Sequence, residues 1–312
     1  MSQLKLIGLP GGNQLGFLAA LGVLRIATRL WPASAPRLHW EAGGNGWYPV
    51  LSLDMDLDQE AFLDALHPAL ATAADHVAFS LPKDGKPLVA DYRAFVRPHL
   101  ARATPGNRDV LDMLAGLVSD LPTVSTADST PEVSPSQLRM VSGGGRQTYL
   151  TAVTALVAET TRGQLSAAVF SPWTYADDAR GHALRLDPRD VALHSTQWKA
   201  PTKAGPAKTM WGALRLSVEA LAVMPVVPLP RRAGTVGFKV VPGGGNEIAV
   251  WTWPMWTVPL RLNTVRSLLA HPGLQPEKPD RQDFAAMGVS EVYRASSYHV
   301  GMLQGFGQPR PA

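Results

Sequence analysis

The sequence predicts an α+β protein, with an N-terminal strand-turn-helix unit followed by a basic C-terminal α+β portion of mixed strands and helices. Three observations support this class. The first residues alternate in polarity as a strand does, and they change to a helical spacing after an N-cap residue. Glycine-rich turns separate two pairs of β-prone segments, as in hairpins. Elsewhere apolar residues recur every three or four positions, which is typical of helices that bury one face.

The N-terminal unit is the most clearly marked part of the chain. Alternating leucines in residues 4–9 predict a short strand, and residues 10–12 predict a tight turn. Asn13 is then the expected N-cap of a helix over residues 14–30, which is apolar over most of its surface and should lie in the core. Glycine inside a helix costs about 1 kcal/mol relative to alanine. We therefore expect a neighbouring element to approach the backbone of this helix closely at Gly16 and Gly22.

The later elements follow from apolar spacing and from turn residues. One strand pair should form a hairpin across the glycine turn at residues 43–46, and a second pair should flank the glycines at residues 243–246. A last helix should start at residue 263. The other predicted strands and helices cover residues 37–40, 47–53, 236–241 and 248–253, and residues 59–70, 108–117, 149–160 and 211–222, respectively.

The 312 residues are enough for one large domain or two ordinary ones, since a domain spans roughly 100 to 200 residues. The stretch from Pro122 to Pro135 is rich in Ser, Thr and Pro and offers little to bury, so we interpret it as an exposed, mobile loop or linker. The sequence therefore predicts an N-terminal α+β domain over residues 1–122, a linker over residues 123–136 and a basic C-terminal α+β domain over residues 137–312.

Composition excludes several classes of protein. With 46% hydrophobic and 17% charged residues, the chain is globular rather than disordered. The absence of cysteine excludes disulfide frameworks and thiolate zinc sites, and it fits a reducing compartment. Lys5 and Pro10 interrupt the apolar N-terminus, so we expect no export signal. No apolar run reaches the ~18 residues that a membrane span needs. We expect a cytoplasmic protein without membrane contact.

Positive charge is concentrated in one fifth of the sequence. Between Arg180 and Lys239 there are ten Lys and Arg residues against three Asp and Glu residues, a balance of +7. The rest of the chain holds 29 − 10 = 19 basic and 25 − 3 = 22 acidic residues, a balance of −3. Such an excess predicts a surface that binds a polyanion, because each cation near a phosphate releases condensed counterions. A solvated basic face is the alternative.

The candidate nucleic-acid-binding residues are cations in or near this segment. Trp198 and Trp211 flank the loop that contains Lys199, Lys203 and Lys208. Cations beside aromatic rings are the combination that holds backbone phosphates and bases. An exposed loop between two core tryptophans is an equally good interpretation. The predicted binding residues are Arg146, Lys199, Lys203, Lys208, Arg215, Arg231, Arg232 and Lys239.

A second aromatic feature lies next to a predicted strand. Trp251, Trp253 and Trp256 follow one another closely, and such side chains could stack on bases. Tryptophans also fill large cores and partner-protein interfaces. These alternatives stay open at the level of sequence.

No catalytic arrangement stands out. Residues 202–209 end in Lys-Thr like a P-loop but lack both glycines that cradle phosphate. Asp54, Asp56 and Asp58 share one face of a possible strand, and Asp177 and Asp178 precede His182. Acidic residues at these spacings are usually the solvent face of a strand or a charged turn, so a metal-dependent nuclease is the weakest function considered. We expect no enzymatic activity, no cofactor and no metal.

Residues 12–25, GNQLGFLAALGVLR, resemble the opening signature of proteins encoded with type I-G (formerly I-U) CRISPR systems. Later landmarks in the same order are also similar to that group. The resemblance implies a large-subunit-like or accessory component of an RNA-guided DNA-targeting complex in antiviral defence. Large subunits of this kind read a short motif in duplex DNA and hold the displaced strand. The later landmarks are residues 170–175, 212–230, 235–238, 253–256 and 262–268.

Taken with the basic segment, this resemblance predicts a non-enzymatic nucleic-acid-binding subunit of a type I CRISPR complex. Its expected partners are target DNA or guide RNA and the other effector subunits of Cascade. The alternative is a scaffold subunit of the same complex that uses the tryptophan segment as its protein interface.

Overall fold

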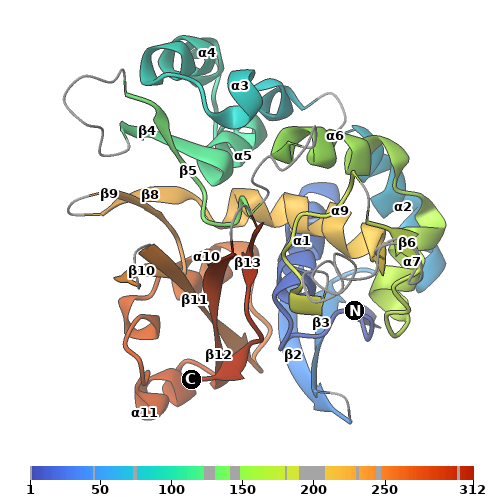
Figure 1. Ribbon diagram of the computed structural model, residues 1–312. Coiled ribbons are helices and arrows are strands. Elements are labelled where there is room, and N and C mark those ends of the chain that lie inside the picture. The colour runs from blue at the N-terminus through green and yellow to red at the C-terminus, as the bar shows by residue number, and fades with distance from the viewer. Residues whose placement is uncertain are drawn as a thin grey trace, which may run out of the picture.

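The computed structural model describes residues 2–44, 46–72, 76–122, 131–140, 148–179, 181–189, 208–229, 232–243, 247–300 and 303–312 (Figure 1). Helices pack with antiparallel sheets, which confirms the predicted α+β class. Among the described helices, none is both long and apolar enough to cross a lipid bilayer.

The predicted N-terminal helix and its cap are confirmed, whereas the strand before it lies at residues 2–5 and not at residues 4–9. Asn13 caps the first helix by accepting a hydrogen bond from the backbone N–H of Gly16 at 3.1 Å. The predicted hairpin also forms, and the first strand adds to it in the order β1-β3-β2. The elements are β1 (Ser2–Lys5), α1 (Gln14–Leu30), η1 (Pro32–Ser34), β2 (Arg37–Gly43) and β3 (Gly46–Leu53).

Helix α1 packs against α9 (Trp211–Ala220), and Figure 1 shows this pair near the middle of the molecule. A methyl group at Gly22 would overlap the carbonyl oxygen of Leu216. The close backbone approach expected at Gly22 is therefore present, and α9 is the element that makes it. Every residue of α9 after Trp211 is buried, because the helix lies between α1 and other helices.

The helices of the middle of the chain surround this pair. Helices at residues 59–70, 108–117 and 149–160 were predicted, and all three are present with similar bounds. The elements are α2 (Gln59–Thr72), η3 (Val77–Ser80), α3 (Pro82–Gly85), α4 (Val89–Ala101), α5 (Asp109–Leu117), β4 (Val118–Pro122), β5 (Val133–Pro135), α6 (Tyr149–Glu159), α7 (Arg162–Phe170), β6 (Asp177–Asp178) and β7 (Lys208–Thr209).

The C-terminal portion contains an antiparallel sheet of order β10-β11-β12-β13, with β14 paired to β12. The predicted strand pair around the glycines is β10 and β11, whereas β12, β13 and β14 were not predicted. The elements are η4 (Leu221–Val223), β8 (Val226–Leu229), β9 (Arg232–Thr235), β10 (Phe238–Pro242), β11 (Glu247–Trp256), α10 (Leu262–Leu269), η5 (Pro272–Leu274), α11 (Arg281–Ala286), β12 (Val289–Val300), β13 (Leu303–Phe306) and β14 (Arg310–Pro311).

The tryptophans of β11 connect this sheet to the N-terminal unit. Trp251, Trp253 and Trp256 are fully buried around the ring of Phe17 in α1, with ring centroids 6.0 to 6.2 Å apart. The indole N–H of Trp253 donates to the carbonyl of Gly11 at 2.9 Å, and that of Trp256 donates to another N-terminal carbonyl. Of the three interpretations of this segment, the core one is therefore correct.

The predicted boundary between two domains does not divide the core. One continuous cluster of buried apolar side chains runs from Leu4 to Phe306 and includes both α1 and α9. The end of the predicted linker requires a correction, because residues 133–135 form strand β5 against β4 and Val133 is buried. Residues 123–130 lie outside the described part of the chain.

Replacing Gly22 with alanine is expected to lower the free energy of unfolding by about 1–3 kcal/mol, because the added methyl group forces α1 and α9 apart. Denaturant unfolding followed by circular dichroism measures this change. Gly163→Ala in helix α7 is the matched control, since the nearest atom to its new methyl group, Thr161 Oγ1, is 4.0 Å away. That variant should be as stable as wild type or slightly more stable. Equal stability of Gly22→Ala and wild type would contradict the role given to Gly22.

Candidate nucleic-acid interface

Four of the eight predicted binding residues belong to the described part of the chain, namely Lys208, Arg215, Arg232 and Lys239. Lys239 is exposed, whereas Lys208 and Arg232 are partly exposed. The other four, Arg146, Lys199, Lys203 and Arg231, lie outside the described residues.

Arg215 requires a correction, because its side chain is 1% exposed in the middle of α9. The guanidinium Nη2 donates to Glu219 Oε1 at 2.9 Å, one helical turn later, and to the carbonyl oxygen of Leu70 at 2.9 Å. Arg215 therefore neutralises a buried carboxylate and cannot touch a polyanion at the surface.

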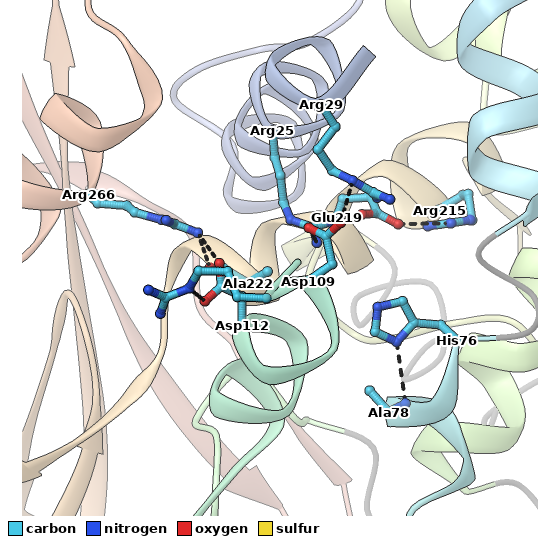
Figure 2. Close-up of polar contacts among 11 residues, drawn as sticks. Arg25, Arg29, His76, Ala78, Asp109, Asp112, Arg215, Glu219, Ala222 and Arg266 are labelled. Atoms are coloured by element: carbon cyan, nitrogen blue, oxygen red, sulfur yellow. Dashed lines mark hydrogen bonds and ion pairs between the residues drawn. The ribbon is translucent and has the colours of Figure 1, made fainter. Parts of the chain in front are cut away.

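Glu219 is the buried centre of an ion network whose outer members, Arg29 and Asp109, reach the surface (Figure 2). Its carboxylate is 1% exposed and accepts hydrogen bonds from Arg215 in its own helix and from Arg25 in α1. Arg25 also donates to Asp109 at the start of α5 at 3.1 Å, and Arg29 forms an ion pair with the same aspartate. The network thus connects three helices through two carboxylates and three guanidinium groups.

Two opposing effects set the pKa of Glu219. Burial alone would raise it, but the charges of Arg215 and Arg25 outweigh burial, and the net pKa of Glu219 is lowered. His76 lies close by, and burial lowers the pKa of its imidazole. Its Nδ1 accepts from the backbone N–H of Ala78 at 3.3 Å. Within the described ranges, no three His, Asp or Glu side chains come together to hold a metal ion.

In the basic segment, the described acidic side chains are buried, whereas most of the described cations reach the surface. Its described acidic residues are Asp187 and Glu219, and each is 1% exposed. Asp187 is held by the side chains of Asn13 and Tyr175, at 3.1 and 2.8 Å, and by the backbone N–H of Arg189 at 2.9 Å. The described cations other than Arg215 reach the surface at least in part, namely Arg185, Arg189, Lys208, Arg232 and Lys239.

One group of these cations lies at the start of α9. The guanidinium carbon of Arg189 is 4.2 Å from the ring centroid of Tyr175, a cation–π contact. The backbone nitrogen of Tyr175 is 3.3 Å from the sulfur of Met210, two residues after Lys208. Tyr175 therefore links the two cations, since Arg189 lies against its ring and Lys208 is two residues before its contact at Met210.

The second group lies beyond the other end of α9, in β9 and β10. Arg232 donates to Glu247 Oε1 at 2.6 Å and to the carbonyl oxygen of Val240 at 3.1 Å, next to Lys239. A helix of ten residues is about 15 Å long, so Lys208 and Arg232 are far apart (Figure 1). The predicted surface is thus divided into two basic places, and an open cavity of about 620 Å³ adjoins Arg232 in the second.

The acidic candidates make local structural contacts. Asp54 pairs with Arg37 at 3.1 Å, and the hydrogen bond from Arg37 lowers the pKa of Asp54. Asp177 accepts hydrogen bonds from the backbone N–H of Trp211 at 2.8 Å and from the amide of Gln164 at 2.7 Å, which fixes the start of α9.

His182 is also held in place, by stacking on Trp211 with ring centroids 3.9 Å apart. Trp211 thus has a packing role at the start of α9, as one of the two interpretations of the loop tryptophans expected. Trp198 lies outside the described residues.

No protein-family model, curated protein or solved structure matches this chain. Sequence reasoning missed the Glu219 network, although a signal was present. Arg215 and Glu219 are four residues apart in an otherwise apolar helix, and Arg25 lies in a second one. The cavity beside Arg232 gave no signal, because its walls come from strands that are distant in sequence.

Replacing Glu219 with glutamine is expected to lower the free energy of unfolding at pH 7 by about 3–5 kcal/mol, because two buried guanidinium groups lose the charge they share. The lowered pKa adds a pH signature. The contribution of Glu219 is complete above the pKa of the unfolded state and is lost as pH falls through the folded value. Wild type should therefore lose stability below about pH 4 more steeply than Glu219→Gln. Denaturant unfolding from pH 3 to 7 measures both effects.

Glu60→Gln is the control for this prediction, because Glu60 forms an ion pair with Arg162 on the surface and its side chain is 75% exposed. Its free energy of unfolding should stay close to that of wild type. If Glu219→Gln behaves like this control, the buried network does not hold the helices together.

Proposed function

We propose that this protein is a non-enzymatic nucleic-acid-binding subunit of a type I CRISPR RNA-guided DNA-targeting complex. The observation that carries the nucleic-acid-binding part is the separation of charge in the basic segment. Asp187 and Glu219 face inward, so they cannot repel a phosphate at the surface. Among the described residues of the segment, five cations reach the surface at least in part while both carboxylates are buried, so the field at this surface is positive.

The two basic places suit a strand more than a small anion. Each place offers a few cations, and a helix about 15 Å long separates them. Phosphates in one DNA strand follow each other at about 3.4 Å along the helix axis of a duplex. A nucleic acid of several nucleotides can therefore contact both places, whereas a single phosphate can contact only one.

The structure weakens the basis of the scaffold alternative. That alternative used the tryptophan segment as its protein interface, and Trp251, Trp253 and Trp256 are buried in the core. The carboxylates considered for a nuclease are engaged as well, since Asp54 pairs with Arg37 and Asp177 holds the start of α9. These contacts therefore favour nucleic-acid binding through cations over the scaffold and nuclease alternatives.

The assignment to a CRISPR complex rests on the resemblance of residues 12–25 and the later landmarks. In the structure, these residues form the turn and the first part of α1, where they pack in the core. Their part is thus to build the fold that presents the cations. If the assignment holds, genes for other effector subunits lie beside the gene of this protein.

The nucleic-acid-binding proposal predicts a steep dependence of affinity on salt. Replacing Lys208 or Lys239 with alanine should reduce the magnitude of the slope of log affinity against log salt by about 0.9 on duplex DNA and about 0.7 on single strands, for one lost phosphate contact. The double variant should show the sum if one nucleic acid spans both basic places. Fluorescence anisotropy with labelled DNA and RNA measures these slopes over about a sixfold range of salt concentration, from roughly 50 to 300 mM.

Lys278→Ala is the matched control, an exposed lysine outside the basic segment, and its slope should equal that of wild type. Sequence preference should not change in any of these variants, because phosphate contacts carry no base information. Wild-type binding that is absent at the lowest salt, or that does not weaken as salt rises, would refute the proposal.

A further inference from the structure

The cavity beside Arg232 lies over one face of the C-terminal sheet. Its volume is about 620 Å³, within the range of about 300–1,000 Å³ that is usual for small-molecule sites. Strands β10, β11, β12 and β13 supply its floor and one rim, and residues 134–140 supply the facing wall. It is separate from the buried network around Glu219.

Small side chains form the floor of this cavity. Val240 pairs with Ala249 across β10 and β11, and the backbone N–H of Ala249 donates to Ser297 Oγ in β12 at 2.9 Å. One step further into the molecule, the same face of the strands carries the nearly parallel rings of Phe238 and Trp251. The floor thus consists of small side chains, and the packed aromatic rings continue the same face of the sheet beside it.

Polar side chains with unused hydrogen-bonding capacity surround the floor. Arg232 donates from Nη1 to Glu247 and from Nη2 to the carbonyl of Val240, and its Nε–H remains in addition to the second N–H of each Nη. Gln137 accepts from the backbone N–H of Thr235 at 2.6 Å with its oxygen, which leaves its amide NH₂. Among the described residues, neither of these donors has a partner.

The opposite rim adds one more donor and an acceptor. The amide nitrogen of Gln304 lies 3.2 Å from His299 Nδ1, so Nδ1 accepts and the imidazole proton is on Nε2. This leaves the Nε2–H of His299 and the amide oxygen of Gln304 available. Donors on Arg232, Gln137 and His299 and an acceptor on Gln304 surround this floor, and they complement a flat heterocycle that carries both donors and acceptors.

We propose that this cavity binds one nucleotide unit, with its base over Ala249 and Ser297 and its polar edges toward Arg232, Gln137, His299 and Gln304. This inference deepens the proposed nucleic-acid-binding function and rests on it. A wholly apolar ligand would leave the polar rim unpaired. A nucleobase uses both the floor and the rim. The nucleotide is either free or an unstacked unit of a bound strand, as in proteins that take single bases out of a stack.

Two probes distinguish these sources. Adenosine and cytidine 5′-monophosphate, titrated in a calorimeter, test the free nucleotide. A single-stranded oligonucleotide carrying one 2-aminopurine tests the strand, because the fluorescence of that base changes when it leaves its neighbours. Ala249→Phe places a ring on the floor and should weaken whichever binding occurs by about tenfold or more, equal to at least about 1.4 kcal/mol.

Ile248→Phe is the matched control, because it adds the same ring to the same strand on the opposite face. It should bind like wild type. Gln304→Ala, on the rim, should also weaken binding and replaces Ala249→Phe if that variant fails to fold by circular dichroism. The salt slope for strand binding should be unchanged in all of these variants, because Lys208 and Lys239 remain.

The inference is overturned if wild type binds neither mononucleotide and leaves 2-aminopurine fluorescence unchanged while strands bind. It is also overturned if folded Ala249→Phe and Gln304→Ala both match wild type. Mononucleotide binding that is lost in Ala249→Phe, without any strand binding, would support the cavity as a free-nucleotide site. The same result would refute the nucleic-acid-binding proposal.

Discussion

Helices α1 and α9 approach so closely at Gly22 that no side chain fits between their backbones, and this contact brings Arg25 to the carboxylate of Glu219. Burying that carboxylate would be costly alone, but two guanidinium groups surround it. The pairing lowers the pKa of Glu219 and keeps it ionised inside the protein. Because α1 comes from the N-terminal unit and α9 from the basic segment, the contact joins both halves of the chain in one core.

The same contact shapes the outer surface. The basic segment directs its described acidic residues inward, Glu219 toward α1 and Asp187 toward the N-cap residue of α1. Cations therefore remain outside at both ends of α9. The C-terminal sheet is fixed to this core by Trp253 and Trp256, whose indole groups donate to N-terminal carbonyls. That attachment positions the sheet face over which the cavity beside Arg232 lies.

Sequence reasoning succeeded where local signals decide the structure. Asn13 and the apolar residues after it define α1, and glycine turns define two hairpins. It missed β12, whose mixture of polar and aromatic residues becomes a strand only through pairing with β11. It misplaced Arg215, because a count of charges treats every cation as exposed, whereas α9 is buried on all sides. The cavity was invisible because it needs the register of four strands and a wall from residues 134–140.

Native-state hydrogen exchange tests the central claim, that the α1–α9 contact unites the protein in one core. Exchange of amide protons reports the free energy of the opening that exposes each one. We predict that residues 17–27 of α1 and residues 213–220 of α9 exchange with the same free energy, the highest in the chain. A markedly lower free energy for α9 than for α1 would show two separate cooperative units, and it would contradict the claim.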